Sequence, residues 1–241
     1  MTFTAPLPAC CPELQHHWPL PTPLKGVVLI SGHFDPAQLT PDDWARSGIT
    51  PPPSIQRSVA KRQAEFLAGR LCAREALHRL DGRLYVPAIG DDRAPVWPAG
   101  LCGSITHSTG WAAAIVAQSG TWRGLGLDAE TLLPEERALR LAGEILTADE
   151  LQRLHALSGD QAALGVTLTF SVKEALFKAL YPIVGKRFYF EDAQVLSWSA
   201  DGQVELQLLC DLSPEWHHGK RLQGQFALHD EHLLSLVAVA G

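Results

Sequence analysis

The sequence predicts an α+β fold of two similar halves, each a helix packed on a small antiparallel sheet. Three observations support this prediction. The 241 residues are 46% hydrophobic and 19% charged, a composition typical of a packed globular protein. Helical segments and runs of strands are segregated along the chain rather than strictly alternating, which favours α+β. Finally, a helix followed by antiparallel strands occurs twice, over residues 25–120 and 121–241.

The first segment, residues 1–24, is predicted to be an extended N-terminal arm. Six prolines there remove backbone donors and block a helix: Pro6, Pro8, Pro12, Pro19, Pro21 and Pro23. After the arm we expect a short buried strand over residues 26–30 and a helical turn over residues 41–48. Three consecutive prolines at positions 51–53 then precede a longer helix.

That helix is predicted over residues 54–80, with Ser54 as its N-cap and Gly82 directly after its end. Apolar residues recur along one face at helical spacing. Arg70 and Arg74 project from the same face, where a long cation needs a carboxylate or phosphate partner. The favoured interpretation of these arginines is a partly buried structural ion pair.

The remaining elements follow from apolar periodicity and turn residues. After an irregular stretch at 86–100, a hairpin is predicted over residues 101–107 and 111–117. A strand over residues 121–130 opens the second half. The other elements of that half are expected to be helices over 135–143, 147–157 and 164–180, the last stopped at Tyr181-Pro182, and strands over 187–198, 204–209, 222–229 and 233–240.

Charge and composition exclude several classes of protein. With 20 Lys and Arg against 26 Asp and Glu, the net charge of −6 argues against a general nucleic-acid-binding surface. The apolar runs are far shorter than the ~20 residues that cross a membrane. No Lys or Arg precedes Lys25, so no signal peptide is expected, and five cysteines without metal-binding spacing fit a reduced cytoplasm. Phosphate-binding loops with the usual glycine patterns are absent from the sequence.

The first chemical signal is the segment Gly124-Leu-Gly-Leu-Asp-Ala-Glu130. Side chains two residues apart on a strand point to one face, so Asp128 and Glu130 present two carboxylates together. Such a pair needs a cation, and Mg²⁺ shared with a substrate phosphate is the usual partner. The alternative is a strand end whose acidic side chains are simply solvated.

The second signal is the helical segment Phe170-Ser-Val-Lys-Glu-Ala-Leu-Phe-Lys178. It gathers Lys173, Glu174 and Lys178 on one helix. A purely structural interpretation is also available, since Ser171 and Glu174 have capping-box spacing and Glu174 and Lys178 form an i,i+4 pair.

The third signal is His107, which is flanked by the hydroxyls of Thr106 and Ser108 at a strand end before a Gly turn. This histidine could donate to a phosphate oxygen, whereas an isolated histidine at a strand end is more often structural. A hydrolase triad is disfavoured because no Gly-x-Ser-x-Gly segment occurs.

Together with the helix Lys61-Arg-Gln-Ala-Glu-Phe-Leu-Ala-Gly-Arg70, these segments resemble the 4′-phosphopantetheinyl transferases of the Sfp and EntD type, especially their broad-range carrier-protein synthases. The resemblance covers about residues 15–241. It implies transfer of 4′-phosphopantetheine from coenzyme A (CoA) to a serine of an apo acyl, peptidyl or aryl carrier protein, leaving adenosine 3′,5′-bisphosphate. It also implies a monomer of two pseudo-symmetric halves with the ligand site at their interface.

The resemblance also implies the roles of individual residues. Asp128, Glu130 and Glu174 would hold Mg²⁺ at the CoA diphosphate, and Glu174 would act as base, directly or through water. Lys178 would neutralise charge or protonate the leaving group, with Lys173 as a helper. The residues that would contact the adenosine portion of CoA are Lys61, Arg93, Thr106 and His107. Thr106 often has Ser as its counterpart in the family, a change that keeps the hydroxyl.

The carrier specificity and the choice between Mg²⁺ and Mn²⁺ stay open at this point. Residues 186–190, two cations followed by aromatic residues, are a candidate surface for carrier docking, and the start of an ordinary strand is an equal alternative. Two other functions compete with the transferase. One is a Mg²⁺-dependent hydrolase of nucleotides or pyrophosphates, and the other is a CoA-binding protein without catalytic activity.

Overall fold

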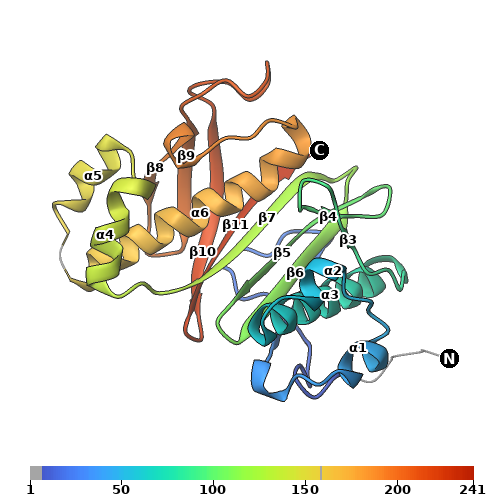
Figure 1. Ribbon diagram of the computed structural model, residues 1–241. Coiled ribbons are helices and arrows are strands. Elements are labelled where there is room, and N and C mark those ends of the chain that lie inside the picture. The colour runs from blue at the N-terminus through green and yellow to red at the C-terminus, as the bar shows by residue number, and fades with distance from the viewer. Residues whose placement is uncertain (1–6, 158) are drawn as a thin grey trace. The chain divides into compact units, whose positions relative to one another are not determined.

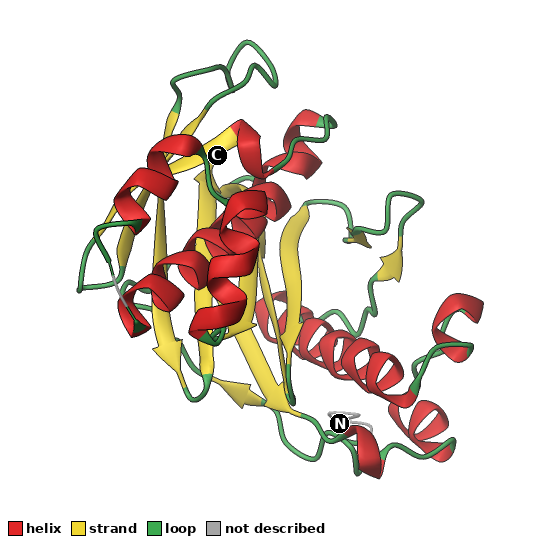
Figure 2. Cartoon of the chain, turned by 60° about the vertical axis from the view of Figure 1, so that its left-hand side comes forward, coloured by secondary structure: helices red, strands yellow, loops and turns green. Residues whose placement is uncertain are grey.

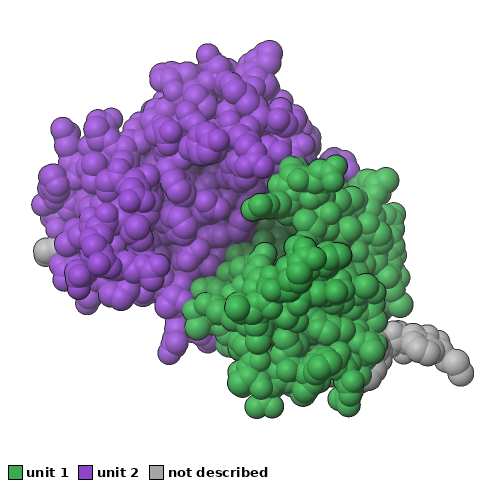
Figure 3. Space-filling view, in the orientation of Figure 1, with its two compact units in different colours: residues 1–18, 25–118 green, residues 19–24, 119–241 purple. Residues whose placement is uncertain are grey.

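The computed structural model describes residues 7–157 and 159–241 (Figure 1). The chain forms two compact units (Figure 3). Unit 1 comprises residues 25–118 and the described residues up to Trp18. Unit 2 comprises residues 19–24 and 119–241. Each unit contains a long helix and an antiparallel sheet, so the predicted α+β class is confirmed. None of the helices in the described ranges is long and apolar enough to cross a membrane.

Unit 1 is built on a four-stranded antiparallel sheet with the order β1-β2-β6-β5. Helix α3 packs on this sheet through its apolar face. The elements of this core are β1 (Gln15–His16), β2 (Val27–His33), β5 (Leu101–Ser108), β6 (Trp111–Gln118) and α3 (Ala60–Asp81). The predicted hairpin of β5 and β6 is confirmed, and residues 41–48 contain the short helix α1 (Asp42–Ser47).

The predicted start of the long helix at Ser54 is wrong. A separate short helix, α2 (Pro53–Gln56), comes first, and α3 begins only after Val59, whose backbone is extended. The side chain of Gln63 donates to the carbonyl of Ser58 at 2.8 Å, which stabilises this break from the C-terminal side. The predicted end is confirmed, because Gly82 takes the left-handed conformation (φ 82°) after α3.

The described part of the N-terminal arm is tied to both units. Cys10 and Cys11 are buried in the core of unit 1, and β1 pairs with β2. Residues 19–24 belong to unit 2, where the backbone N–H and carbonyl of Thr22 both bond to the side-chain amide of Gln225. Residues 1–6 of the predicted arm lie outside the described residues.

Two short strands and a helical turn complete unit 1. Strands β3 (Ala88–Ile89) and β4 (Pro95–Val96) pair within the stretch that was expected to be irregular. The 3₁₀ turn η1 (Pro36–Gln38) is capped by Asp35, whose carboxylate accepts from the N–H of Ala37.

Unit 2 is built on a five-stranded antiparallel sheet with the order β7-β11-β10-β9-β8, crossed by helix α6 (Figures 1 and 2). Its apolar core lies between α6 and the sheet. The elements of unit 2 are β7 (Trp122–Thr131), α4 (Glu135–Ile145), α5 (Ala148–Leu154), α6 (Asp160–Val184), η2 (Phe190–Asp192), β8 (Ala193–Trp198), β9 (Gln203–Leu208), β10 (Arg221–His229) and β11 (His232–Ala240).

Several predicted boundaries in unit 2 are wrong. Helix α5 ends at Leu154 rather than at residue 157, and α6 begins at Asp160 rather than at residue 164. Helix α6 also continues through Pro182 to Val184, because the proline removes only one backbone donor and the helix ends where Gly185 takes the left-handed conformation (φ 65°). The strand predicted from residue 187 begins only at Ala193. Residues 190–192 form a 3₁₀ turn instead, in which the carboxylate of Asp192 accepts from the N–H of Tyr189.

Candidate active site

Two glycines of β7 bring α6 into direct backbone contact with that strand. A Cβ atom on Gly126 would lie 1.8 Å from the carbonyl oxygen of Ala175, and one on Gly124 would lie 2.2 Å from that of Ala179. Only glycine therefore allows the helix to lie this close. The consequence is that the side chains of α6 next to these contacts reach the acidic end of β7.

Asp128 is the centre of the resulting site. Lys178 Nζ donates to Asp128 Oδ1 at 2.6 Å, and Ser171 Oγ donates to Asp128 Oδ2 at 2.8 Å. Only 3% of Asp128 is exposed, so the alternative of an acidic strand end that is simply solvated is wrong for this residue. A carboxylate at this depth requires such charged or hydrogen-bonding partners.

Glu130 and Glu174 belong to the same electrostatic cluster. Burial, followed by the charge of Asp128, raises the pKa of Glu130 to about 7, although Lys178 and Arg137 oppose the shift. Burial also raises the pKa of Glu174, with a further contribution from Asp128 and an opposing one from Lys178. Burial of carboxylates whose charges also interact disfavours their ionised forms, and an added cation would offset this cost.

The three carboxylates fit a hard divalent cation by their chemistry, since Mg²⁺ prefers carboxylate and water oxygens. Within residues 7–157 and 159–241, no three acidic, histidine or cysteine side chains already surround one point as metal ligands. The positive charge beside Asp128 comes instead from Lys178, whose Nζ also donates to the carbonyl of Leu127 at 3.2 Å. Asp128, Glu130 and Glu174 thus have suitable chemistry for Mg²⁺, although their side chains do not form a three-ligand cluster in the described part of the chain.

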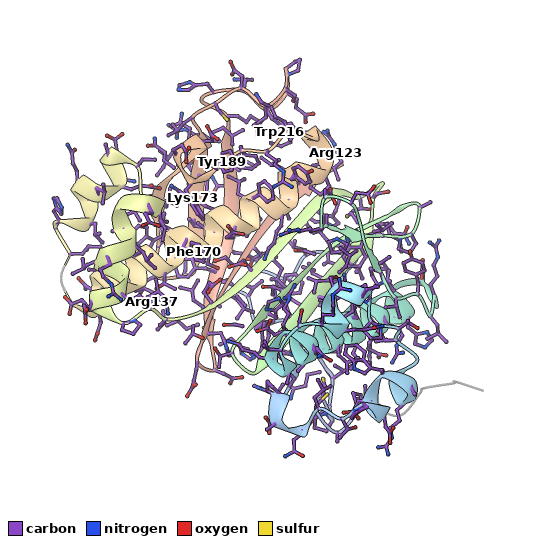
Figure 4. All side chains as sticks on the ribbon, viewed as in Figure 1. Arg123, Arg137, Phe170, Lys173, Tyr189 and Trp216 are labelled. Atoms are coloured by element: carbon purple, nitrogen blue, oxygen red, sulfur yellow. The ribbon has the colours of Figure 1, made fainter. Side chains whose placement is uncertain are left out.

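Lys173 is not brought to these carboxylates, although it precedes Glu174 in the chain. Its Nζ donates to Glu150 Oε2 at 2.8 Å and to the carbonyls of Ile145 and Phe190, each at 2.9 Å. Burial lowers the pKa of Lys173, and the ion pair with Glu150 opposes this shift. The side chain therefore connects α6 to α5, to the end of α4 and to the turn before β8 (Figure 4 labels Lys173).

A pocket of about 180 Å³ opens beside Glu174. Four of its eight lining residues are aromatic and three are charged. The lining residues are Lys173, Glu174, Phe177, Arg187, Phe188, Tyr189, Phe190 and Ala193. This site is therefore polar at its carboxylates and apolar next to them.

In unit 1, His107 lies against α3 and contacts Arg62 and Glu65 of that helix. The Nε2 atom of His107 is 2.7 Å from Arg62 Nη1, and its Nδ1 atom is 3.7 Å from Glu65 Oε2. Lys61 is an exposed neighbour in the first turn of the helix. Arg62 was not among the residues predicted from the sequence, although its i,i+3 spacing to Glu65 indicates the ion pair that the structure contains.

The other two residues predicted to contact CoA lie elsewhere in unit 1. Thr106 is 3% exposed and points to the opposite face of β5 from His107, because neighbouring strand residues alternate. Arg93 is exposed in the turn between β3 and β4, with a positive φ of 73°.

The predicted ion pair of the helix arginines is also wrong. Arg74 donates to the backbone carbonyl of Ser47. Arg70 is 6% exposed, and its guanidinium lies 4.6 Å from the centre of the Phe66 ring. Arg70 Nε has no hydrogen-bond partner among the described residues, and burial together with the charge of Arg62 lowers the pKa of Arg70 to about 10. Arg62 and Arg70, with His107 beside them, thus form a cationic region of unit 1 in which Glu65 supplies one carboxylate.

Each unit contains a segment that matches a known protein family. Residues 51–117 match the 4′-phosphopantetheinyl transferase N-terminal domain, and residues 124–237 match the 4′-phosphopantetheinyl transferase superfamily. The second match includes all four residues of the acidic site that were discussed above, from Asp128 to Lys178.

Curated relatives cover most of the chain. Enterobactin synthase component D of Escherichia coli (strain K12) is 37% identical over 179 residues, which are 73% of this chain and 81% of that protein. The 4′-phosphopantetheinyl transferase PptT of Mycobacterium tuberculosis is 39% identical over 158 residues, 61% of this chain and 66% of that protein. The chain therefore belongs to the 4′-phosphopantetheinyl transferase superfamily, of the type to which enterobactin synthase component D belongs.

Proposed function

We propose that the acidic site of unit 2 is the catalytic centre for transfer of 4′-phosphopantetheine from CoA to apo carrier proteins, the activity of this family. The observation that carries the assignment is the cluster of Asp128, Glu130, Glu174 and Lys178 at the contact of α6 with β7. Phosphoryl transfer depends mainly on positioning and on neutralisation of charge. A cluster of carboxylates beside a lysine can supply both, once a cation is bound.

Asp128, Glu130 and Glu174 are the residues that would hold Mg²⁺. The bound ion would neutralise the diphosphate of CoA and orient it. Because Lys178 already lies 2.6 Å from Asp128 Oδ1, it is positioned to contribute a second positive charge at the same place. Its proton can also go to the leaving group.

Glu174 is the proposed base for the serine of the carrier. A raised pKa makes a carboxylate a stronger proton acceptor near neutral pH. The serine oxygen would form a bond to the β-phosphorus of CoA while its proton passes to Glu174, directly or through water. The bond from that phosphorus to the bridging oxygen would break, and adenosine 3′,5′-bisphosphate would leave with the electron pair.

The cationic region of unit 1 is proposed to bind phosphates of the adenosine portion of CoA. Arg62, Arg70 and His107 are the residues best suited to this role, because Arg70 is buried without a carboxylate partner in the described structure. The predicted roles of Lys61, Arg93 and Thr106 stay untested. Next to Glu174, the aromatic pocket is proposed to receive the pantetheine arm.

Carrier proteins are the second substrate, and we propose residues 186–190 as part of the surface that receives them. This segment lies outside the strands, so its interpretation as the start of a strand is wrong. Tyr189 is 64% exposed, and Arg187 lies 5.9 Å from the centre of the Tyr181 ring. The enzyme is further proposed to act as a monomer in the cytoplasm, where its five cysteine thiols would stay reduced.

Incubation of the protein with CoA, MgCl₂ and a purified apo carrier protein tests this proposal by mass spectrometry of the carrier. We expect the mass of the carrier to increase by one phosphopantetheine. Glu174→Gln should abolish the increase, whereas Glu144→Gln, at an exposed glutamate of α4, should not. Consumption of CoA without modification of the carrier would favour the hydrolase. Binding of CoA by both the wild-type protein and Glu174→Gln, with no modification of the carrier and no consumption of CoA by the wild-type protein, would favour the inactive binding protein.

A further inference from the structure

Ser171 has a fully buried hydroxyl that reaches out of its own helix. It is 0% exposed, and its Oγ donates to Asp128 Oδ2 at 2.8 Å. Ser171 lies well inside α6, eleven residues after the helix begins at Asp160, so its spacing to Glu174 is not that of a helix start. The capping-box interpretation of these two residues is therefore wrong.

Two other buried hydroxyls of α6 donate within the helix, although that of Thr167 also accepts from the N–H of Leu133. Thr167 Oγ1 donates to the carbonyl of Ala163, and Thr169 Oγ1 donates to the carbonyl of Gly165, each at 2.8 Å and four residues back in the helix. Such bonds within the helix are the usual solution for a hydroxyl in this position. Ser171 instead donates to a carboxylate on β7, which is the stronger, charge-assisted kind of hydrogen bond.

The hydrogen bond fixes the rotation of the Asp128 carboxylate. With Oδ2 held by Ser171, the other oxygen, Oδ1, is directed to Lys178. Ser171 and Lys178 are seven residues apart on α6, two helical turns, and Glu174 lies between them on the same side. Ser171, Glu174 and Lys178 thus all face the acidic site from one side of α6.

We propose that Ser171 is a positioning residue, which orients Asp128 so that Oδ1, the acceptor of the Lys178 hydrogen bond, faces the acidic site and the cation proposed there. This inference rests on the proposed function, because it assumes that Asp128 is a metal ligand. Outer hydrogen-bond partners of ligands typically change metal affinity by 10–100-fold when they are removed. Ser171 thereby acts through Asp128 and contacts no reacting atom itself.

The test is direct measurement of Mn²⁺ binding, by electron paramagnetic resonance of the free ion, for the full-length protein. Ser171→Ala is expected to weaken Mn²⁺ binding by roughly 10-fold or more. Thr169→Val is the matched control, because it removes a buried hydroxyl two residues away that bonds only within α6. It should leave the affinity unchanged. Thermal unfolding of each variant shows whether the fold is retained.

Two further variants separate hydrogen bonding from packing. Ser171→Cys keeps the size of the side chain but is a weak donor, so it should weaken Mn²⁺ binding as the alanine variant does. Ser171→Thr keeps the hydroxyl and should restore binding. Equal affinities of wild type, Ser171→Ala and Ser171→Cys would overturn the proposal for Ser171. Failure of the wild-type protein to bind Mn²⁺ would instead overturn the metal site of the proposed function.

Discussion

Replacement of Lys173 by methionine tests whether this lysine stabilises the fold or takes part in the chemistry. Its side chain is 2% exposed, that of its partner Glu150 is 3% exposed, and the two charges are 2.8 Å apart. Removing one partner of such a buried pair leaves an uncompensated charge and costs about 3–5 kcal/mol. With a urea m-value of about 3 kcal/mol/M, the midpoint of unfolding should decrease by about 1 M or more.

The structure offers a matched comparison on the same helix. Lys178 is 28% exposed and bonds to Asp128 at the acidic site, so Lys178→Met should reduce kcat with a smaller loss of stability. Urea unfolding followed by circular dichroism, together with the rate of carrier modification, measures both properties. Glu150→Gln combined with Lys173→Met should recover part of the lost stability, because no buried charge then lacks a partner.

The opposite pattern would refute this reasoning. If Lys173→Met unfolded at the urea concentration of the wild type while kcat fell strongly, Lys173 would act in the reaction. The bonds from Nζ to the carbonyls of Ile145 and Phe190 would then have no measurable role in stability. Equal instability of Lys173→Met and Lys178→Met would also contradict the distinction between them.

Three further predictions follow from the site. Gly126→Ala should destabilise unit 2 and abolish transfer, because the added Cβ would overlap a carbonyl of α6. Gly143→Ala should be tolerated, because no atom lies within 4 Å of the Cβ that it would add. Thermal unfolding and the rate of carrier modification measure the two variants. Burial and the charge of Asp128 raise the pKa of Glu130 to about 7, and protonation of Glu130 opposes metal binding, so Mn²⁺ affinity should fall about tenfold from pH 8 to pH 6. A flat profile would contradict this. Arg62→Gln should raise KM for CoA more than Lys61→Gln, and the reverse order would show that the contact with His107 is unimportant.

Much of the site could be predicted from the sequence because its chemistry is local. The alternation of Asp128 and Glu130 on a strand and the turn of helix from Glu174 to Lys178 follow from standard geometry. Which of two neighbouring residues faces the site does not follow from standard geometry. Lys173 and Glu174 differ by one residue, which is about 100° of helix rotation, and so their surroundings depend on how α6 lies on β7.

The same difficulty applies to Lys61 and Arg62. Motif resemblance predicted a role for Lys61 in the first turn of α3, but only the structure shows that its neighbour Arg62 contacts His107. The predicted start of α3 was wrong for a related reason. The break before Ala60 depends on the Gln63 side chain, which bonds to a carbonyl five residues earlier, and no periodicity of apolar residues records such a bond.

The partner of Lys178 shows how tertiary contacts override a local pattern. In an isolated helix, Glu174 and Lys178 would be a favourable i,i+4 pair worth about 0.2–0.5 kcal/mol. In the folded unit, Lys178 Nζ lies 2.6 Å from Oδ1 of the almost fully buried Asp128. A charge at that depth gains more from the lysine than a surface pair does. Gly124 and Gly126 make this exchange of partners possible, because they allow α6 to approach β7 closely enough for the lysine to reach the strand.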